Sequence, residues 1–175
     1  MKIDIHISNV TNTVYDSFIQ GLELGEAFSV ELSVSPTAKI LASDFEWEEG
    51  ISEVRQMDQC IAWFHRMLKI PKGKQICSVA GQTDLLNRSF GPYSLRGTAD
   101  LVFISDAYVK TSNIRGGIEI VVELKKEVLK SDFKQATLQL VSASSYSHYP
   151  VVVLHTDLRE AWQFLLLVYV SIHGA

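Results

Sequence analysis

The sequence predicts an α/β fold in which a mixed central β-sheet is flanked by helices, within one domain of 175 residues. Short β-branched and aromatic runs alternate with two segments whose apolar residues recur at helical spacing. Hydrophobic residues make up 47% of the chain and charged residues 21%, which is typical of a globular domain with a sizeable core. No internal repeat, low-complexity tract or linker divides the chain, so one domain over 1–175 is expected.

The N-terminal third carries weaker structural signals, and we treat 1–43 as an N-terminal extension. Residues 2–8 alternate strictly between apolar and polar side chains, which predicts a half-buried strand. The segment 14–24 has helical apolar spacing but also contains glycines, so its structure stays open. A short strand is predicted around 28–34.

The core is expected to span about 44–170 and to begin with a long helix. Ser43 and Glu46 match a capping box, in which each side chain satisfies a free backbone N–H group of a helix start. The apolar residues that follow keep amphipathic spacing as far as Leu68, and Pro71 ends the pattern. These features predict one helix over 44–69, bent at Gly50.

The remaining elements follow from shorter patterns. Strands are predicted at 74–80, 98–108, 117–125 and 151–155. The segment 81–92 is predicted as a loop and 110–117 as a turn. A second helix is predicted over 131–145, and 161–171 is either a last strand or a buried helix.

Charged side chains interrupt the most apolar strand. In 117–125 the alternation places Glu123 and Lys125 side by side, opposite a face of four aliphatic residues. Asp100 opens the preceding strand, and an antiparallel hairpin would bring it beside Glu123. Two adjacent carboxylates raise each other's pKa unless they share a cation, and Mg²⁺ suits such a pair. A solvated cross-strand ion pair is the alternative interpretation of Glu123 and Lys125.

These residues resemble a nuclease family. The segments 97–100 and 123–125, with Gln135 and Gln139 on the following helix, are similar to the signature of the PD-(D/E)XK nuclease superfamily. More narrowly, the chain resembles the restriction-endonuclease-type C-terminal domains of Crinkler effectors in the segments 97–126, 135–140 and 152–158, ahead of Trp162. The resemblance covers about 44–170.

The resemblance implies a restriction-endonuclease-like core and divalent-metal-dependent cleavage of a phosphodiester in nucleic acid, chiefly DNA. Asp100 and Glu123 would hold Mg²⁺ or Mn²⁺, and Lys125 would assist the attacking water. The family places an acidic residue on its first core helix, and Glu53 is the candidate here. Ala99 stands where the family usually has proline.

Candidate nucleic-acid contacts surround this motif. Phosphate contacts dominate nonspecific affinity, so basic and amide side chains near the motif are the natural candidates. Gln135 and Gln139 lie one turn apart on the predicted helix, on the face that we expect to be polar. An ordinary solvated face explains the same pattern. The candidates are Lys126, Lys130, Gln135, Gln139 and Arg96.

Composition disfavours several other functions. The formal net charge of −4 requires a local basic patch for any nucleic-acid contact. Cys60 and Cys77 form no CxxC motif, and the histidines lack the spacing of paired zinc ligands. The longest apolar run has seven residues, whereas a membrane span needs about 20. We therefore expect a soluble intracellular domain with no membrane partner.

Two functions remain. The first is a metal-dependent endonuclease domain of an effector, favoured by the three motif residues. The second is a catalytically inactive nuclease-like module that binds nucleic acid or a host protein, favoured by the negative net charge. The resemblance also implies secretion as part of a longer effector, action in a host nucleus, and a homodimer of the kind that cuts both DNA strands.

Overall fold

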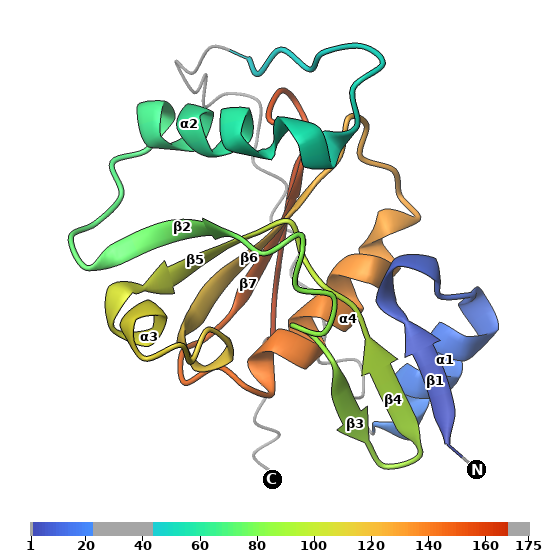
Figure 1. Cartoon of the computed structure of the whole chain (residues 1–175). Helices are drawn as coiled ribbons and strands as arrows, with labels where there is room; N and C mark the ends of the chain where they lie inside the picture. The colour runs from blue at the N-terminus through green and yellow to red at the C-terminus, as the bar shows by residue number, and fades with distance from the viewer. Residues whose placement is uncertain (1, 23–43, 168–175) are drawn as a thin grey trace, which may run out of the picture.

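The computed structural model describes residues 2–22 and 44–167, which form a mixed α/β fold with two mixed sheets (Figure 1). The larger sheet has the strand order β2-β5-β6-β7-β8. Its strands are β2 (Lys74–Ser78), β5 (Leu101–Ser105), β6 (Ile118–Leu124), β7 (Val152–Thr156) and β8 (Trp162–Leu166). β6 and β7 pair in parallel, and the other neighbouring strands pair antiparallel. The predicted mixed sheet is therefore present.

The larger sheet is covered by one helix on each face (Figure 1). Helix α2 (Met57–Met67) packs Cys60, Trp63 and Phe64 against strand residues such as Val122. Helix α4 (Asp132–Ser144) packs Ala136, Leu138 and Leu140 into a second cluster that contains Val121. Because both faces are covered, the central strand β6 is apolar along nearly its whole length.

A bulge in β6 changes the expected alternation. Phe103 pairs with Ile120, but the next residue of β5, Ile104, pairs with Ile118, so Glu119 has no opposite residue. Ile118 consequently packs in the α4 cluster while Ile120 packs in the α2 cluster. The prediction that these two isoleucines share a face is wrong. Lys74 of β2 forms an ion pair with the carboxylate of Glu119.

A smaller sheet lies beside α4 (Figure 1) and has the order β1-β4-β3. Its strands are β1 (Ile3–His6), β4 (Tyr93–Arg96) and β3 (Arg88–Phe90). β1 confirms the strand predicted over 2–8, and it runs parallel to β4. The predicted loop over 81–92 is wrong at its end, because β3 pairs with β4 through a tight turn in which Gly91 has φ +52°.

The N-terminal segment belongs to the core. A 3₁₀ turn, η1 (Ile7–Asn9), follows β1, and helix α1 (Asn12–Gly21) follows η1. The open segment 14–24 is thus helical as far as Gly21. Ile5, Ile7 and Phe18 are buried in the same cluster as α4. The strand predicted around 28–34 lies outside the described residues.

The first core helix is much shorter than predicted. A 3₁₀ turn, η2 (Glu53–Gln56), precedes α2, and 44–52 contains no helix. The buried Gln56 amide accepts from Glu48 N at 2.8 Å and donates to Ile51 O at 3.0 Å, so a side chain replaces helical backbone bonds. Gly50 has φ +73°, which a right-handed helix does not allow.

The other elements largely match their predictions. The strand predicted over 98–108 shortens to β5, because α3 (Asp106–Lys110) follows it directly. The predicted turn over 110–117 ends in a 3₁₀ turn, η3 (Arg115–Gly117). The second helix is confirmed as α4, and β8 shows that the described part of 161–171 is a strand.

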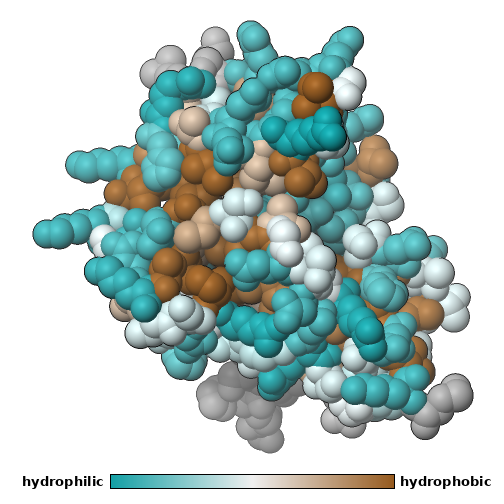
Figure 2. All heavy atoms as spheres, viewed as in Figure 1, coloured by the Kyte–Doolittle hydropathy of each residue, from teal (hydrophilic) through white to brown (hydrophobic). Residues whose placement is uncertain are grey.

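The surface seen in Figure 2 is mostly hydrophilic, with apolar atoms emerging between α2 and β2. Partly buried members of the α2 cluster include Ile61, Met67, Ile70 and Phe103. In the described part of the chain, no helix combines the length and hydrophobicity needed to cross a membrane.

Replacing Gly117 with alanine should destabilise the fold, because a Cβ atom there would overlap the Tyr108 side chain between η3 and α3. We expect Gly117→Ala to lower the free energy of unfolding by about 1–3 kcal/mol, the usual range for overpacking. The matched control is Gly81→Ala, where a Cβ atom meets nothing within 4 Å. Urea denaturation would measure both. Equal stability of the two variants would contradict this packing.

Candidate active site

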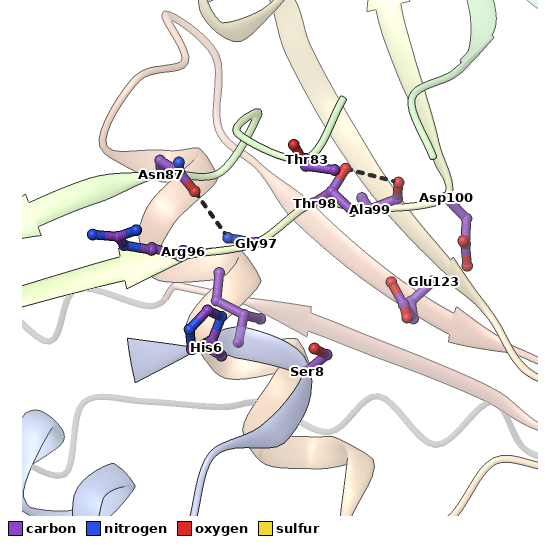
Figure 3. Close-up of a pocket in the computed structure, with 11 residues that line it drawn as sticks. His6, Ser8, Thr83, Asn87, Arg96, Gly97, Thr98, Ala99, Asp100 and Glu123 are labelled. Carbon is purple, nitrogen blue, oxygen red and sulfur yellow. Dashed lines mark hydrogen bonds between the residues drawn. The ribbon is translucent and has the colours of Figure 1, made fainter. Parts of the chain in front are cut away.

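The β5–β6 pair brings Asp100 and Glu123 together, as the sequence predicts. Asp100 directly precedes β5, and its N–H donates to Val122 O at 3.2 Å. Its carboxylate oxygen Oδ2 accepts from Leu124 N at 2.7 Å, which fixes the side chain against the end of β6. Both carboxylates line one cavity (Figure 3). The hairpin geometry expected from the sequence is therefore confirmed.

Glu123 is a buried charge held by three side chains. It is 7% exposed, and a carboxylate so far from water needs strong hydrogen-bond donors. Lys125 Nζ and Gln135 Nε2 donate to its Oε1 at 2.9 Å and 2.7 Å. Gln139 Nε2 donates to its Oε2 at 2.7 Å. Both glutamine donors come from α4, so the helix covering this sheet face also solvates the carboxylate.

A second layer orients Gln139. Its amide nitrogen also donates to Thr98 O at 3.2 Å, and its Oε1 lies 3.0 Å from His155 Nε2. Because an amide oxygen can only accept, His155 carries its proton on Nε2. His155 Nδ1 is buried and finds no hydrogen-bond partner among the residues that the structure describes. Burial, followed by the nearby charge of Lys125, lowers the pKa of His155 to about 3, so this ring is neutral.

The two carboxylates repel each other. Burial, followed by the negative charge of Glu123, raises the pKa of Asp100 to about 7. The Leu124 N–H and the charge of Lys125 act in the opposite direction but are outweighed. Asp100 therefore takes up a proton near neutral pH when no cation is bound.

Lys125 remains a cation. Burial lowers its pKa, but the charge and hydrogen bond of Glu123, reinforced by Asp100, outweigh burial and raise it overall. A lysine of raised pKa does not accept a proton near neutral pH. The assistance to a water molecule that the resemblance implies would therefore be electrostatic and positional.

The cavity over the carboxylates has a volume of about 380 Å³, and residues from both sheets line it (Figure 3). Its lining includes the polar side chains of Thr83, Asn87, Thr98, His6 and Arg96. Asn87 Oδ1 accepts from Gly97 N at 3.0 Å and so fixes the end of β4 above the site. The contribution of β1 and η1 was missed by sequence reasoning, because it requires pairing between residues about ninety positions apart.

Glu53 lies near the site but on η2, not on a long helix. Its Oε1 accepts from Lys126 N at 2.8 Å, which orders the chain just after β6. Its charge contributes weakly to the raised pKa of Asp100. Among residues 2–22 and 44–167, no group of three His, Cys, Asp or Glu side chains is placed to hold a metal ion. Glu53 therefore supports the backbone here and does not complete a three-ligand set.

The candidate nucleic-acid contacts form two groups, the glutamines of α4 that bond Glu123 and the basic residues outside that helix. Gln139 is fully buried, so its prediction as a surface contact is wrong, and Gln135 is half-buried with its amide on Glu123. Helical spacing identified their common face, but it could not show that this face covers a buried carboxylate. Lys126 Nζ donates to Glu48 O at 3.0 Å. Lys130 and Arg96 are exposed.

The donor set suits a hard divalent cation. Asp100 and Glu123 supply oxygen atoms of the kind that Mg²⁺ and Mn²⁺ prefer, and the cavity has room for water molecules to complete the coordination. Burial, followed by the charge of Glu123, raises the pKa of Asp100, and a bound cation would offset both effects. We therefore treat the pair as the candidate metal ligands.

Comparison with known proteins finds a partial similarity. The chain is 34% identical over 73 residues to Crinkler effector protein 161 of Phytophthora sojae, covering 40% of this chain and 16% of that protein. The chain thus spans only a small part of that relative's length. No protein-family model matches the sequence. No solved structure gives a significant match. The similarity supports the expected resemblance to Crinkler effectors, while membership of the PD-(D/E)XK superfamily stays a prediction.

Asp100→Asn should stabilise the metal-free protein at neutral pH. The folded-state pKa of Asp100 is about 7, above the unfolded value, so stability present below about pH 4 is lost as pH rises through 7. An asparagine side chain keeps an oxygen that accepts from Leu124 N, and it does not become negatively charged as the pH rises. We expect a gain near zero at pH 4, rising to on the order of 2–4 kcal/mol at pH 8.

Thermal melts in a chelating buffer from pH 4 to pH 8 would measure this gain. The control Asp84→Asn removes the same charge from an exposed side chain and should change the melting temperature little at any pH. A gain for Asp100→Asn that does not grow with pH would contradict the proposed repulsion.

Proposed function

We propose that this chain is a divalent-metal-dependent nuclease domain that hydrolyses phosphodiester bonds in nucleic acid. The proposal rests on one observation: Asp100 and Glu123 meet on the floor of a polar cavity, with Lys125 bonded to the second carboxylate. In this site a bound Mg²⁺ or Mn²⁺ would polarise the scissile phosphate and lower the pKa of a water molecule. The restriction-endonuclease-like core and the PD-(D/E)XK assignment are part of this proposal.

Each residue of the site has a separate role in the proposed reaction. Asp100 and Glu123 hold the cation, and Gln135 and Gln139 keep the Glu123 carboxylate in one orientation. Lys125, which stays protonated and donates to Glu123, would stabilise negative charge that develops on phosphate oxygens. Such preorganised charge needs no rearrangement during the reaction. DNA is the substrate that the resemblance favours.

The biological setting is also proposed. The similarity to a Crinkler effector supports a domain of a longer, secreted effector that acts in a host nucleus, and a homodimer would place two such sites on the two strands of a duplex. These proposals concern a whole protein, of which this chain matches only a part.

A second candidate function is that of a binding module with the same fold and no catalytic activity. Glu123 already receives three donors, so its charge is stabilised without a metal ion. The described residues also lack a third acidic ligand at the pair. In this alternative the cavity binds nucleic acid or a host protein and cleaves nothing.

Cleavage of labelled single-stranded and plasmid DNA in Mn²⁺, with a chelator as the blank, tests the proposal. Asp100→Asn and Lys125→Met should each lower the rate by at least about 100-fold, because each removes a metal ligand or a charge at the reacting phosphate. Asp100→Asn is preferable to Glu123→Gln, since a glutamine amide at position 123 would face three donors. The matched control Lys74→Met removes a lysine–glutamate pair from the other end of β6 and should retain activity.

The same variants separate the two functions. Mn²⁺ should raise the melting temperature of the wild type but not that of Asp100→Asn. A wild type that neither responds to Mn²⁺ nor cleaves DNA would support the binding module instead.

A further inference from the structure

We infer that the cavity over Asp100 and Glu123 accepts one unpaired nucleotide, so that the substrate is single-stranded nucleic acid rather than a continuous duplex. The inference rests on the proposed function, and it deepens that function by naming the class of strand. The second sheet adds a wall beside the end of β6, so that Glu123 lies in a partly open cavity.

The smaller sheet aligns two recognition side chains at one end of the cavity. β1 runs parallel to β4 with His6 opposite Arg96, and the alternation of both strands sends Ile5 and Leu95 into the core. His6 and Arg96 therefore share the outer face of this sheet. Both line the cavity, away from Asp100 and Glu123 in Figure 3.

The Arg96 guanidinium at that end of the cavity can exchange its aspartate partner for a phosphate. Arg96 Nη2 lies 3.3 Å from Asp4 Oδ2, and about half of each side chain is exposed. An ion pair so exposed to water is weak, and a phosphate can replace the aspartate on a planar guanidinium. The His6 ring beside it offers a surface on which an unstacked base can lie.

Two further side chains of the cavity lining can read a base or a sugar. Asn87 Oδ1 is taken by Gly97 N, and among the described residues nothing accepts from Asn87 Nδ2. Thr83 contributes a second polar side chain from the loop after β2. Hydrogen bonds to base edges need bases that are free of their partners, as single strands present them.

The volume of the cavity suits one nucleotide better than a base-paired stack. The volume of about 380 Å³ lies at the lower end of the range for pockets that hold one small ligand. Glu123, at 7% exposure, lies below walls formed by η1 on one side and by the segment 83–87 on the other. A base-paired nucleotide must leave its stack to reach the carboxylates, whereas an unpaired nucleotide does not pay that cost.

Fluorescence anisotropy in a chelating buffer tests the inference without turnover. The probes are a labelled 12-nucleotide single strand of mixed sequence and the same strand annealed to its complement. We expect the single strand to bind the wild type at least about 10-fold more tightly than the duplex. Duplex binding that is equal or tighter would overturn the inference.

Variants locate the binding site. Arg96→Gln should weaken single-strand binding about 3- to 10-fold and reduce the salt slope by about 0.7, the loss of one phosphate contact. The control Arg88→Gln removes the same charge from β3, where the guanidinium lies 4.6 Å from the centre of the Tyr146 ring, outside the cavity lining. It should leave affinity within 2-fold. Sensitivity of Arg88 but not Arg96, with both variants folded by circular dichroism, would place the strand elsewhere and overturn the inference.

The failures of the two proposals differ. A protein that prefers single strands but cleaves nothing in Mn²⁺ sustains the inference and rejects the nuclease. A protein that cleaves duplex and single strands equally keeps the nuclease and overturns the inference. A protein that binds neither probe and cleaves nothing in Mn²⁺ rejects both.

Discussion

The burial of one negative charge organises this fold. Glu123 stands at the end of the most apolar strand, between two covered faces, and its carboxylate persists there because α4 and Lys125 supply donors. The position of α4 is therefore constrained by polar bonds as well as by its leucines. The Nε2-protonated tautomer of His155 follows from the orientation of Gln139, whose amide donates to that charge. The same charge adds to burial in raising the pKa of Asp100, whereas burial and Lys125 keep the His155 ring neutral.

In the function that we propose, the same constraint separates a catalytic part of the protein from a part that selects the substrate. The β5–β6 pair with α4 forms the catalytic part, in which carboxylates and a lysine are held at short range. The smaller sheet contributes no acidic group to the cavity lining, and it supplies the side chains that would meet a ligand. The two parts share one buried cluster, in which Ile5 and Leu95 pack with Val121 and the leucines of α4. Ile7 of η1 lies so near Gly97 that a Cβ atom on residue 97 would overlap its side chain.

Sequence reasoning succeeded where the determining interactions are local. The alternation in β6 and its short connection to β5 were enough to bring Asp100 beside Glu123, because the two strands are neighbours in the chain. It failed where a side chain forms the hydrogen bonds that a helical backbone would form, as the Gln56 amide does in 44–52. It also failed for Gln139, because the spacing of polar residues on a helix cannot distinguish water from a buried carboxylate. The cavity walls depend on pairing across the chain, which no pattern within a short window reveals.

The parallel pairing of β1 with β4 also bears on the order of folding. The contacts between β5 and β6 join residues about twenty positions apart, whereas His6 and Arg96 are about ninety positions apart. Loop-closure entropy makes such long-range pairing slow, so we expect the carboxylate pair to assemble before β1 docks. A nascent chain would then pass through a stage in which the carboxylates face open solvent. The proposed cation site would then form before the proposed preference for single-stranded nucleic acid. The two properties would arise in separate steps of folding.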